Sequence, residues 1–475
     1  MKTLSHLALI AAVLLYGTSA FAAPPRHLLA DSETMKAEPD AKPAPPSVTD
    51  KLGRQSLTLE QAQAIALSHY PQILAAESAT KAAKQEVKIS RSNYLPQVTG
   101  NAIRAFAEQN TRIGAPGTLN NPTVIDRGSA GVSASQLITD FGRTNDLIET
   151  SKLELEAQKA RGNLTRETVL LDATRAYYNL LRAQELLRVA ERTLKTRHTV
   201  WDQINSLRNA KMKSNLDVSI ANQFIGEAKL LLLQATNGVE NAQATLSEAL
   251  GYSEPRTFTV VDNAKIEKPP ADMDALVQQA MDHNPELAAL KAEHSAAQKF
   301  AEAEQEAHYP TVSALGYAGS TPLREDDQPI KSRSLAGGVN VSIPFYTGGR
   351  LSAREHEAAD KANIAGQNLL TQKNQLLRDI RIALSNVQTA YQNISVMKDV
   401  VKNANESLDL TQERYHIGSS SIVDLSQAQL AQTQAQIEGA NATYEYLISR
   451  AYLDYKLGNG VVDSLSKQKN TYGIE

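Results

Sequence analysis

Apolar residues recur every seven positions over two long stretches of the chain, a pattern typical of helices packed in a coiled coil. The first stretch carries no proline between residues 143 and 209, which predicts a single helix of roughly 100 Å. The repeating positions are Leu180, Leu187, Leu194 and Trp201, and 207 residues later Val387, Ile394, Val401 and Leu408. A second helix, rich in Ala and Gln, is predicted to return over 214–250 and over 422–457. Each stretch therefore predicts a long helical hairpin.

The hairpins belong to a larger duplication. The matched pairs are Asp217 with Asp424 and Gly251 with Gly458 at an offset of 207, and Pro71 with Pro285 and Pro96 with Pro310 at an offset of 214. Repetition at this period indicates one architecture built from two copies of a unit. We assign the first repeat to 57–251 and the second to 271–460, each with a helix, two strands and a long hairpin. A connector over 252–270 joins them, and a tail over 461–475 follows.

Period-two alternation marks the strand candidates. In the second copy Val339, Val341, Ile343 and Phe345 alternate with less apolar residues, and the counterpart in the first copy is 129–138. Weaker candidates precede them at 97–109 and 311–321. Strands of roughly ten residues can cross an outer membrane when tilted. The pattern alone fits equally well a small soluble sheet that caps the helices.

The N-terminus favours the membrane interpretation. Lys2, an apolar run from Leu7 to Tyr16 and the small residues around Phe21 predict a secretory signal over 1–22. A Pro-rich linker is expected over 23–56, and no later stretch reaches the eighteen apolar residues of a spanning helix. Strands would then have to do the spanning. Because four strands cannot close a membrane barrel and open edges are not tolerated in lipid, several chains would share one barrel.

Composition excludes several classes of function. The chain has no cysteine, which rules out disulfides and thiol chemistry, and its formal charge of -3 gives no reason to expect a nucleic-acid partner. Its nine histidines are scattered without the spacing of metal ligands. No Ser-His-Asp arrangement, paired-carboxylate motif or phosphate loop is found. We therefore expect no enzyme, no metal and no cofactor.

The turns that close the two hairpins are the candidate site. Asp217 and Asp424 recur at the same point of both turns, where a helix begins. One interpretation is that each carboxylate only supports its helix start, since negative charge stabilises a helix N-terminus. The other is that, in a symmetric oligomer, these carboxylates ring a lumen and act on passing cations.

Several motifs, in the same order in both copies, resemble the TolC family of outer-membrane efflux proteins over about residues 57–460. They are Leu59-Glu60-Gln61-Ala62 with Pro71, Tyr94-Leu95-Pro96, Ser342-Ile343-Pro344-Phe345-Tyr346-Thr347-Gly348-Gly349-Arg350, and Tyr415-His416-Ile417-Gly418 followed by Ile422-Val423-Asp424-Leu425. The resemblance implies an α+β membrane protein, a homotrimer whose chains give four strands each to a 12-stranded outer-membrane barrel. A long α-helical coiled-coil barrel would continue it across the periplasm. The implied partners are outer-membrane lipid, a periplasmic adaptor protein and an inner-membrane transporter.

The resemblance also implies roles for tip residues. Asp424 would form an acidic ring in the lumen, and Asp217 and Tyr415 would share a hydrogen bond that holds the closed tip. The chain departs from the family pattern at Gln427, where a second acidic ring would fall, and at Ser420, where an Arg would link neighbouring hairpins. The expected adaptor-docking residues are Gly418, Ser419, Ser420, Ser421, Lys211, Met212 and Lys213.

The expected function is an exit duct for small toxic compounds, drugs or secreted proteins, with no chemistry of its own. A channel for protein secretion and a channel for drug efflux are not separated by the sequence. The alternative from another class is a soluble periplasmic coiled-coil adaptor or structural spacer without a pore.

Overall fold

The structure is a computed structural model that describes residues 56–105, 127–320 and 333–459. The predicted signal sequence, almost all of the Pro-rich linker and the predicted tail lie outside the described residues. The chain forms two compact units. The sheet unit includes Arg91–Thr144 and Gln305–Leu351, and the helical unit includes Asn145–Glu304 with the described parts of Thr49–Ser90 and Ser352–Glu475.

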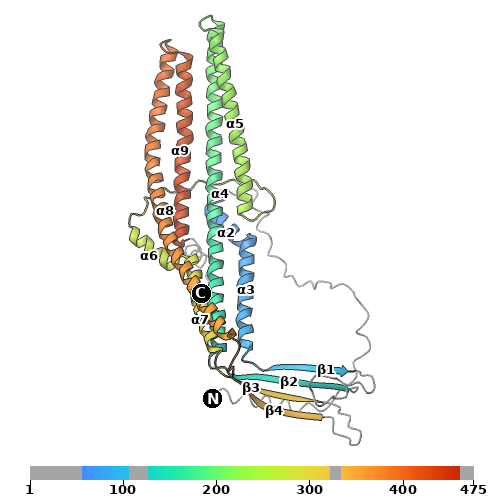
Figure 1. Cartoon of the computed structure of the whole chain (residues 1–475). Coiled ribbons are helices and arrows are strands. Elements are labelled where there is room, and N and C mark those ends of the chain that lie inside the picture. Colours follow the sequence, from blue (N-terminus) through green and yellow to red (C-terminus); the bar gives the residue numbers. More distant parts are fainter. Residues whose placement is uncertain (1–55, 106–126, 321–332, 460–475) are drawn as a thin grey trace, which may run out of the picture. The chain divides into compact units, whose positions relative to one another are not determined.

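The order of elements repeats along the chain, two helices, two strands and a long hairpin in each half (Figure 1). The first half holds α2 (Leu59–His69), α3 (Pro71–Ser92), β1 (Gln97–Ala105), β2 (Arg127–Thr139), α4 (Arg143–Asn209) and α5 (Asn215–Ala249). The second half holds α6 (Met273–His283), α7 (Pro285–Glu306), β3 (Thr311–Ser320), β4 (Arg333–Ser342), α8 (Arg350–His416) and α9 (Ile422–Leu457). The long helices α4 and α8 each have 67 residues, which confirms the duplicated fold.

Proline divides the helix before each pair of strands. In the first copy, α2 ends at His69 and α3 begins at Pro71. The second copy repeats the break, since α6 ends at His283 and Pro285 begins α7. Proline suits the first position of a helix because its missing N–H would have no partner there.

A capping box fixes the start of α2. The Thr58 N–H donates to Gln61 Oε1 at 3.0 Å, and the Gln61 N–H donates to Thr58 Oγ1 at 3.3 Å. These two bonds satisfy backbone donors that lack a partner inside the helix.

The strands form one antiparallel sheet in the order β1-β2-β3-β4, with β1 and β4 at its edges. β4 ends at Ser342, so Ile343 and Phe345 lie beyond it and not within a strand as their alternation predicted. Pro344 gives the reason, because a residue without an N–H cannot continue a ladder of backbone hydrogen bonds.

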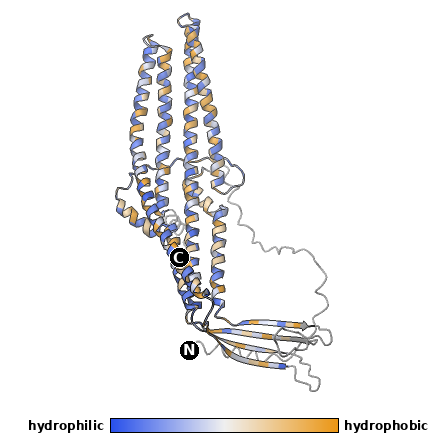
Figure 2. Ribbon diagram, in the orientation of Figure 1, coloured by the Kyte–Doolittle hydropathy of each residue, from blue (hydrophilic) through white to orange (hydrophobic). Residues whose placement is uncertain are grey.

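The register gives the sheet one apolar and one polar face. Gly100, Val132, Ala318 and Leu335 lie opposite one another across all four strands and project to the same side. That side carries Val98, Ala102, Val132, Ala134, Val312, Ala314, Ala318, Leu335, Val339 and Val341, with Gln136, Ser320 and Arg333 as its polar exceptions. The other side carries Thr99, Asn101, Ser133, Ser135, Ser313, Tyr317, Ser334, Asn340 and Ser342, with Ile103, Leu137 and Leu315 as its large apolar exceptions. Figure 2 shows the resulting alternation of hydropathy along the strands.

The helical unit has two clusters of buried apolar side chains. The larger one contains residues from all eight helices α2 to α9 and includes the seam residues Leu180 and Val387. The smaller one lies near the hairpin ends and includes Ile204 and Leu408. The heptad positions predicted from the sequence therefore contribute to both clusters. None of the described helices is apolar over a length that would cross a membrane.

The connector between the repeats is held against this core by Tyr177 of α4. Leu57 and Val260 form a parallel β-bridge, and the Tyr177 hydroxyl lies 2.9 Å from the Leu57 carbonyl oxygen and 2.7 Å from that of Val261. The Tyr177 side chain is buried, so no water is expected to replace these contacts.

Removing this hydroxyl should destabilise the helical unit. We expect Tyr177→Phe to lower the free energy of unfolding by about 1–3 kcal/mol, because the carbonyls of Leu57 and Val261 both lose the hydroxyl as a donor and Leu57 keeps the Val261 N–H. The measurement is a urea titration followed by circular dichroism. The control is the neighbouring Tyr178→Phe, since Tyr178 makes no hydrogen bond through its hydroxyl within the described chain. Equal losses in the two variants would contradict the prediction.

Candidate functional site at the hairpin tips

The first tip joins α4 to α5 through a tight turn. The Lys211 N–H donates to the Arg208 carbonyl at 2.9 Å, and the Met212 N–H donates to the Leu207 carbonyl at the same distance. Lys211 has a φ of 62°, the left-handed conformation that normally favours glycine. Ser214 then caps α5: its N–H and its hydroxyl each donate to Asp217 Oδ2 at 2.8 Å.

The second tip, between α8 and α9, has the same construction. Gly418, at the position equivalent to Lys211, has a φ of 80°. Ser421 caps α9, with its N–H and hydroxyl donating to Asp424 Oδ2 at 2.9 and 2.7 Å. The hydroxyl of Ser420 donates to the same oxygen at 3.1 Å. The residue expected to depart from the family pattern therefore adds a hydrogen bond to the cap.

The capping bonds keep both carboxylates ionised. The backbone N–H and hydroxyl of Ser421, with the hydroxyl of Ser420, lower the pKa of Asp424 below its ordinary value. At Asp217, partial burial acts to raise the pKa, but hydrogen bonds from Ser214 and the charge of Lys213 outweigh it and the net shift is downward. The structure thus gives each Asp its helix-capping role, and at neutral pH each tip carries a fixed negative charge.

Tyr415 lies close to Asp217 without bonding to it. Burial, and then the negative charge of Asp217, raise the pKa of the Tyr415 hydroxyl. That hydroxyl is buried and has no hydrogen-bond partner among the residues that the structure describes. The Asp217–Tyr415 hydrogen bond implied by the family resemblance is therefore not formed here, and Asp217 Oδ2 accepts from Ser214 instead. Lys213 instead places its Nζ 4.3 Å from the centre of the Tyr415 ring.

The predicted docking residues lie at the exposed ends of the hairpins. Gly418, Ser419 and Ser421 are exposed, as are Lys211 and Met212, while Lys213 and Ser420 are half-buried. The sequence analysis missed two exposed apolar side chains beside them, Leu216 and Ile417, of which Ile417 is 80% exposed. The signal that could have found them is a large apolar residue inside a polar turn, where no core is available to cover it.

No metal centre accompanies these carboxylates. The described residues contain no group of three or more His, Cys, Asp or Glu side chains arranged to hold a metal ion. Within the described chain the Asp424 carboxylate accepts hydrogen bonds from Ser420 and Ser421 at its own helix start. The arrangement can act on solutes through charge and shape.

The fold and the tips define a class of protein in which a long helical hairpin occurs twice in one chain, together with a small antiparallel sheet that has one apolar and one polar face. A family model described as outer membrane efflux protein matches residues 64–252 and 276–459. The chain belongs to this family. Its members are channel proteins and not enzymes.

Individual relatives agree with this assignment. The outer membrane protein TolC of Escherichia coli (strain K12) is 25% identical over 402 residues, covering 82% of this chain and 79% of the relative. The outer membrane efflux protein BepC of Brucella suis is 23% identical over 391 residues, covering 82% of this chain and 83% of the relative. The crystal structure of the Campylobacter jejuni CmeC outer membrane channel matches with a TM-score of 0.74 at 18% identity, covering 88% of this chain and 90% of that one.

Proposed function

We propose that the protein is an outer-membrane exit duct that works as a homotrimer with a periplasmic adaptor protein and an inner-membrane transporter. Membership of the outer membrane efflux protein family supports export across the outer membrane and does not favour the soluble spacer. The observation that carries the proposal for this chain is the sheet, whose apolar residues gather on one face and whose polar residues gather on the other. In a water-filled membrane barrel those faces meet lipid and lumen.

Aromatic side chains support the placement of the sheet in a bilayer. Tyr94, Phe141, Tyr309, Phe345 and Tyr346 all lie just beyond one end of the strands and are exposed. Phe141 and Tyr309 contact each other with ring centroids 6.2 Å apart. Girdles of aromatic residues mark the membrane–water interfaces of outer-membrane barrels. This end of the sheet would therefore lie at the periplasmic interface, with the duct continuing into the periplasm after removal of the signal sequence over 1–22.

The edges of the sheet support the trimer. β1 and β4 each have a neighbour on one side only, and their free edges would expose unpaired backbone groups to lipid. Because β1 and β4 run in opposite directions within the sheet, the β4 edge of one copy can pair antiparallel with the β1 edge of the next. Three copies would close the barrel with twelve strands, four from each chain.

The tips are the proposed point of contact with the adaptor and the proposed constriction. Exposed apolar side chains at the tips, such as Met212, which is 72% exposed, offer area for a protein partner. The Asp424 carboxylate is exposed and its pKa is lowered, so three copies around one axis would form a ring of negative charge. Acidic rings of this kind select or block cations at close range. Asp217 and Tyr415 would line the same constriction.

Neutralising the ring tests the proposal. The Asp424→Asn protein, purified in detergent and inserted in a planar bilayer, should conduct, but block by a multivalent cation should weaken about ten-fold or more. An Asn side chain still offers an oxygen to the Ser421 N–H, so the helix start is kept. The measurement is single-channel conductance with the cation added to each side in turn.

The matched control removes the same charge elsewhere on the hairpin. Asp360→Asn changes an exposed Asp of α8 and should leave cation block unaltered. If the cation blocks the Asp424→Asn and Asp360→Asn channels as strongly as it blocks the unmodified channel, the assignment of an acidic ring to Asp424 is wrong. If folded protein forms no channel at all, the proposal of an exit duct is wrong. Release of the protein from membranes by high salt, without detergent, would then support the alternative of a soluble spacer.

A further inference from the structure

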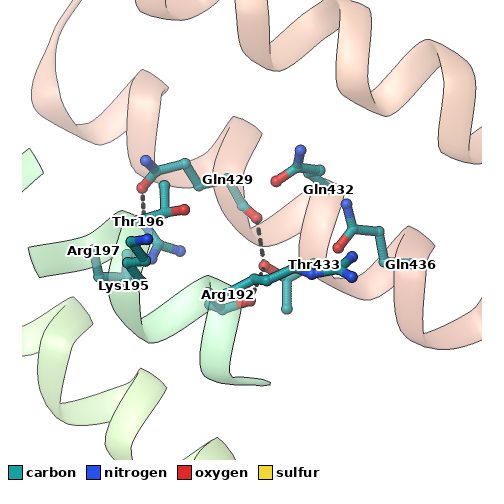
Figure 3. Close-up of a pocket in the computed structure, with 9 residues that line it drawn as sticks. Arg192, Lys195, Thr196, Arg197, Gln429, Gln432, Thr433 and Gln436 are labelled. Carbon is teal, nitrogen blue, oxygen red and sulfur yellow. Dashed lines mark hydrogen bonds between the residues drawn. The ribbon is translucent and has the colours of Figure 1, made fainter. Parts of the chain in front are cut away.

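A cavity between the two hairpins of one chain has the composition of an anion site. It has a volume of about 290 Å³ and lies between α4 and α9, within the helical unit (Figure 3). Arg192, Lys195 and Arg197 bring three cationic side chains to it, while its remaining lining is hydroxyl and amide, with no carboxylate. Its volume is near the lower end of the range for small-molecule sites.

The floor of the cavity holds a buried guanidinium that forms no ion pair with a described carboxylate. Arg197 is 6% exposed, and no described carboxylate lies within ion-pair distance of it. It donates one hydrogen bond, from Nη1 to Gln429 Oε1, and packs its guanidinium 4.9 Å from the centre of the Phe224 ring. Burial lowers the pKa of Arg197, with the charge of Glu227 acting in the opposite direction. An uncompensated buried charge is costly unless a partner of opposite sign reaches it.

A second donor on the same floor also lacks an acceptor. Gln429 is 3% exposed, and its Nε2 is buried with no hydrogen-bond partner in the described chain. The neighbouring hydroxyls do not supply one, because Thr433 donates to the Gln429 carbonyl at 2.9 Å and contacts Thr193 at 3.3 Å. Buried donors normally find an acceptor. The cavity therefore presents unpaired donors and positive charge together.

The repeat does not require these residues. At the equivalent positions of the other copy stand Ala404 in place of Arg197 and Asn222 in place of Gln429. The second copy of the hairpin is thus built without them, and the cavity lies where α4 of the first hairpin meets α9 of the second. Arg192 and Lys195 are exposed and lie at its mouth, where they can meet a solute from water.

We propose that this cavity binds a small multivalent oxyanion, such as a free di- or tricarboxylate, between Arg197 and Gln429 on the floor and Arg192 and Lys195 at the mouth. Oxyanion groups supply the acceptors that the guanidinium and the Gln429 amide lack, and charge-assisted hydrogen bonds of this kind are the strong ones. Because Arg197 and Gln429 belong to different hairpins, a bound anion holds α4 and α9 together. The duct wall thereby acquires a ligand that links its two halves.

Calorimetric titration of the purified full-length protein with citrate, at an ionic strength held constant with sodium chloride, tests this site. Citrate should bind saturably and raise the thermal midpoint as its concentration rises, since a ligand that binds only the folded state stabilises it. The double variant R192Q/K195Q changes only exposed side chains and should bind citrate at least about ten-fold more weakly. Arg197→Gln should abolish saturable binding.

A second double variant removes the same charge away from the cavity. Lys159→Gln with Lys402→Gln changes two exposed lysines of α4 and α8, and citrate should bind it as it binds the unmodified protein. Non-saturable heats in the unmodified protein overturn the proposal. So does equal weakening in both double variants, which would assign the effect to net charge. The citrate titration does not depend on the proposed channel, because the site lies within one chain. A protein that failed to conduct could therefore still bind citrate.

Discussion

Replacing Val132 by Arg is expected to cost about 2–4 kcal/mol of folding free energy in a lipid bilayer. Val132 is exposed on the apolar face of β2, level with Gly100 of β1 and Leu335 of β4. If this face meets lipid, the guanidinium must be placed in hydrocarbon. The measurement is a urea titration of the protein folded into lipid vesicles, with the folded fraction followed by protection from protease.

The control places the same charge on the opposite face at nearly the same depth. Asn101 is exposed on the polar face of β1, and its pairing partner on β2 is Gly131, next to Val132. Asn101→Arg should change the folding free energy by less than about 1 kcal/mol, because a lumen substitution meets water. Equal costs on the two faces would contradict the assignment of lipid to the apolar side.

Gly458→Ala is expected to cost about 2–4 kcal/mol, from two separate penalties. Gly458 ends α9 with a φ of 77°, so any side chain there is strained. A Cβ at this position would also stand 2.6 Å from the His283 carbonyl oxygen, and backbone atoms cannot move aside as a flexible side chain can. The readout is the midpoint of thermal unfolding followed by circular dichroism.

Gly418→Ala isolates the first penalty. Gly418 has a φ of 80°, almost that of Gly458, but a Cβ there would meet nothing within 4 Å. This variant should cost only about 1 kcal/mol. If Gly418→Ala lost as much stability as Gly458→Ala, backbone conformation alone would account for the losses in both variants. The close contact of Gly458 with the end of α6 would then contribute nothing.

The same contact recurs in the first copy. Gly251 has a φ of 82° and lies against the backbone of His69 and Tyr70, at the break between α2 and α3. Gly458 lies against His283 and Asn284, at the break between α6 and α7. The glycine at the end of each returning helix thus packs against the backbone just before the proline of each break. The sequence revealed the glycines and the prolines as repeated residues, but only the structure shows this packing.

The candidate site was predictable where its parts are neighbours in sequence. Ser214 with Asp217, and Ser421 with Asp424, lie three residues apart, which is the spacing of a capping box, and their repetition marked the tips. The bond expected between Asp217 and Tyr415 was not predictable, because 198 residues separate them in the chain. In the structure Asp217 accepts from Ser214 at its own helix start, and the Tyr415 hydroxyl has no partner among the described residues.

The proposed anion cavity was not predictable either, because its parts are far apart in the sequence. Arg197 and Gln429 lie 232 residues apart, on helices whose heptad pattern predicts packing but not which polar residues face each other. Neither residue belongs to a recognisable motif. Their contact depends on the rotation and axial register of α4 against α9, which small side chains along the seam allow to vary.

By itself, the sequence determined the duplication, the long helices, the repeated prolines, the carboxylates of the tips and the presence of strands. Each of these depends on short-range spacing, which backbone geometry converts directly into local structure. Tertiary structure decided the end of β4, the two-sided composition of the whole sheet, the missing Asp217–Tyr415 bond and the meeting of Arg197 with Gln429. These depend on register between elements far apart in the chain, and register is set by the sum of many packing contacts that no local pattern contains.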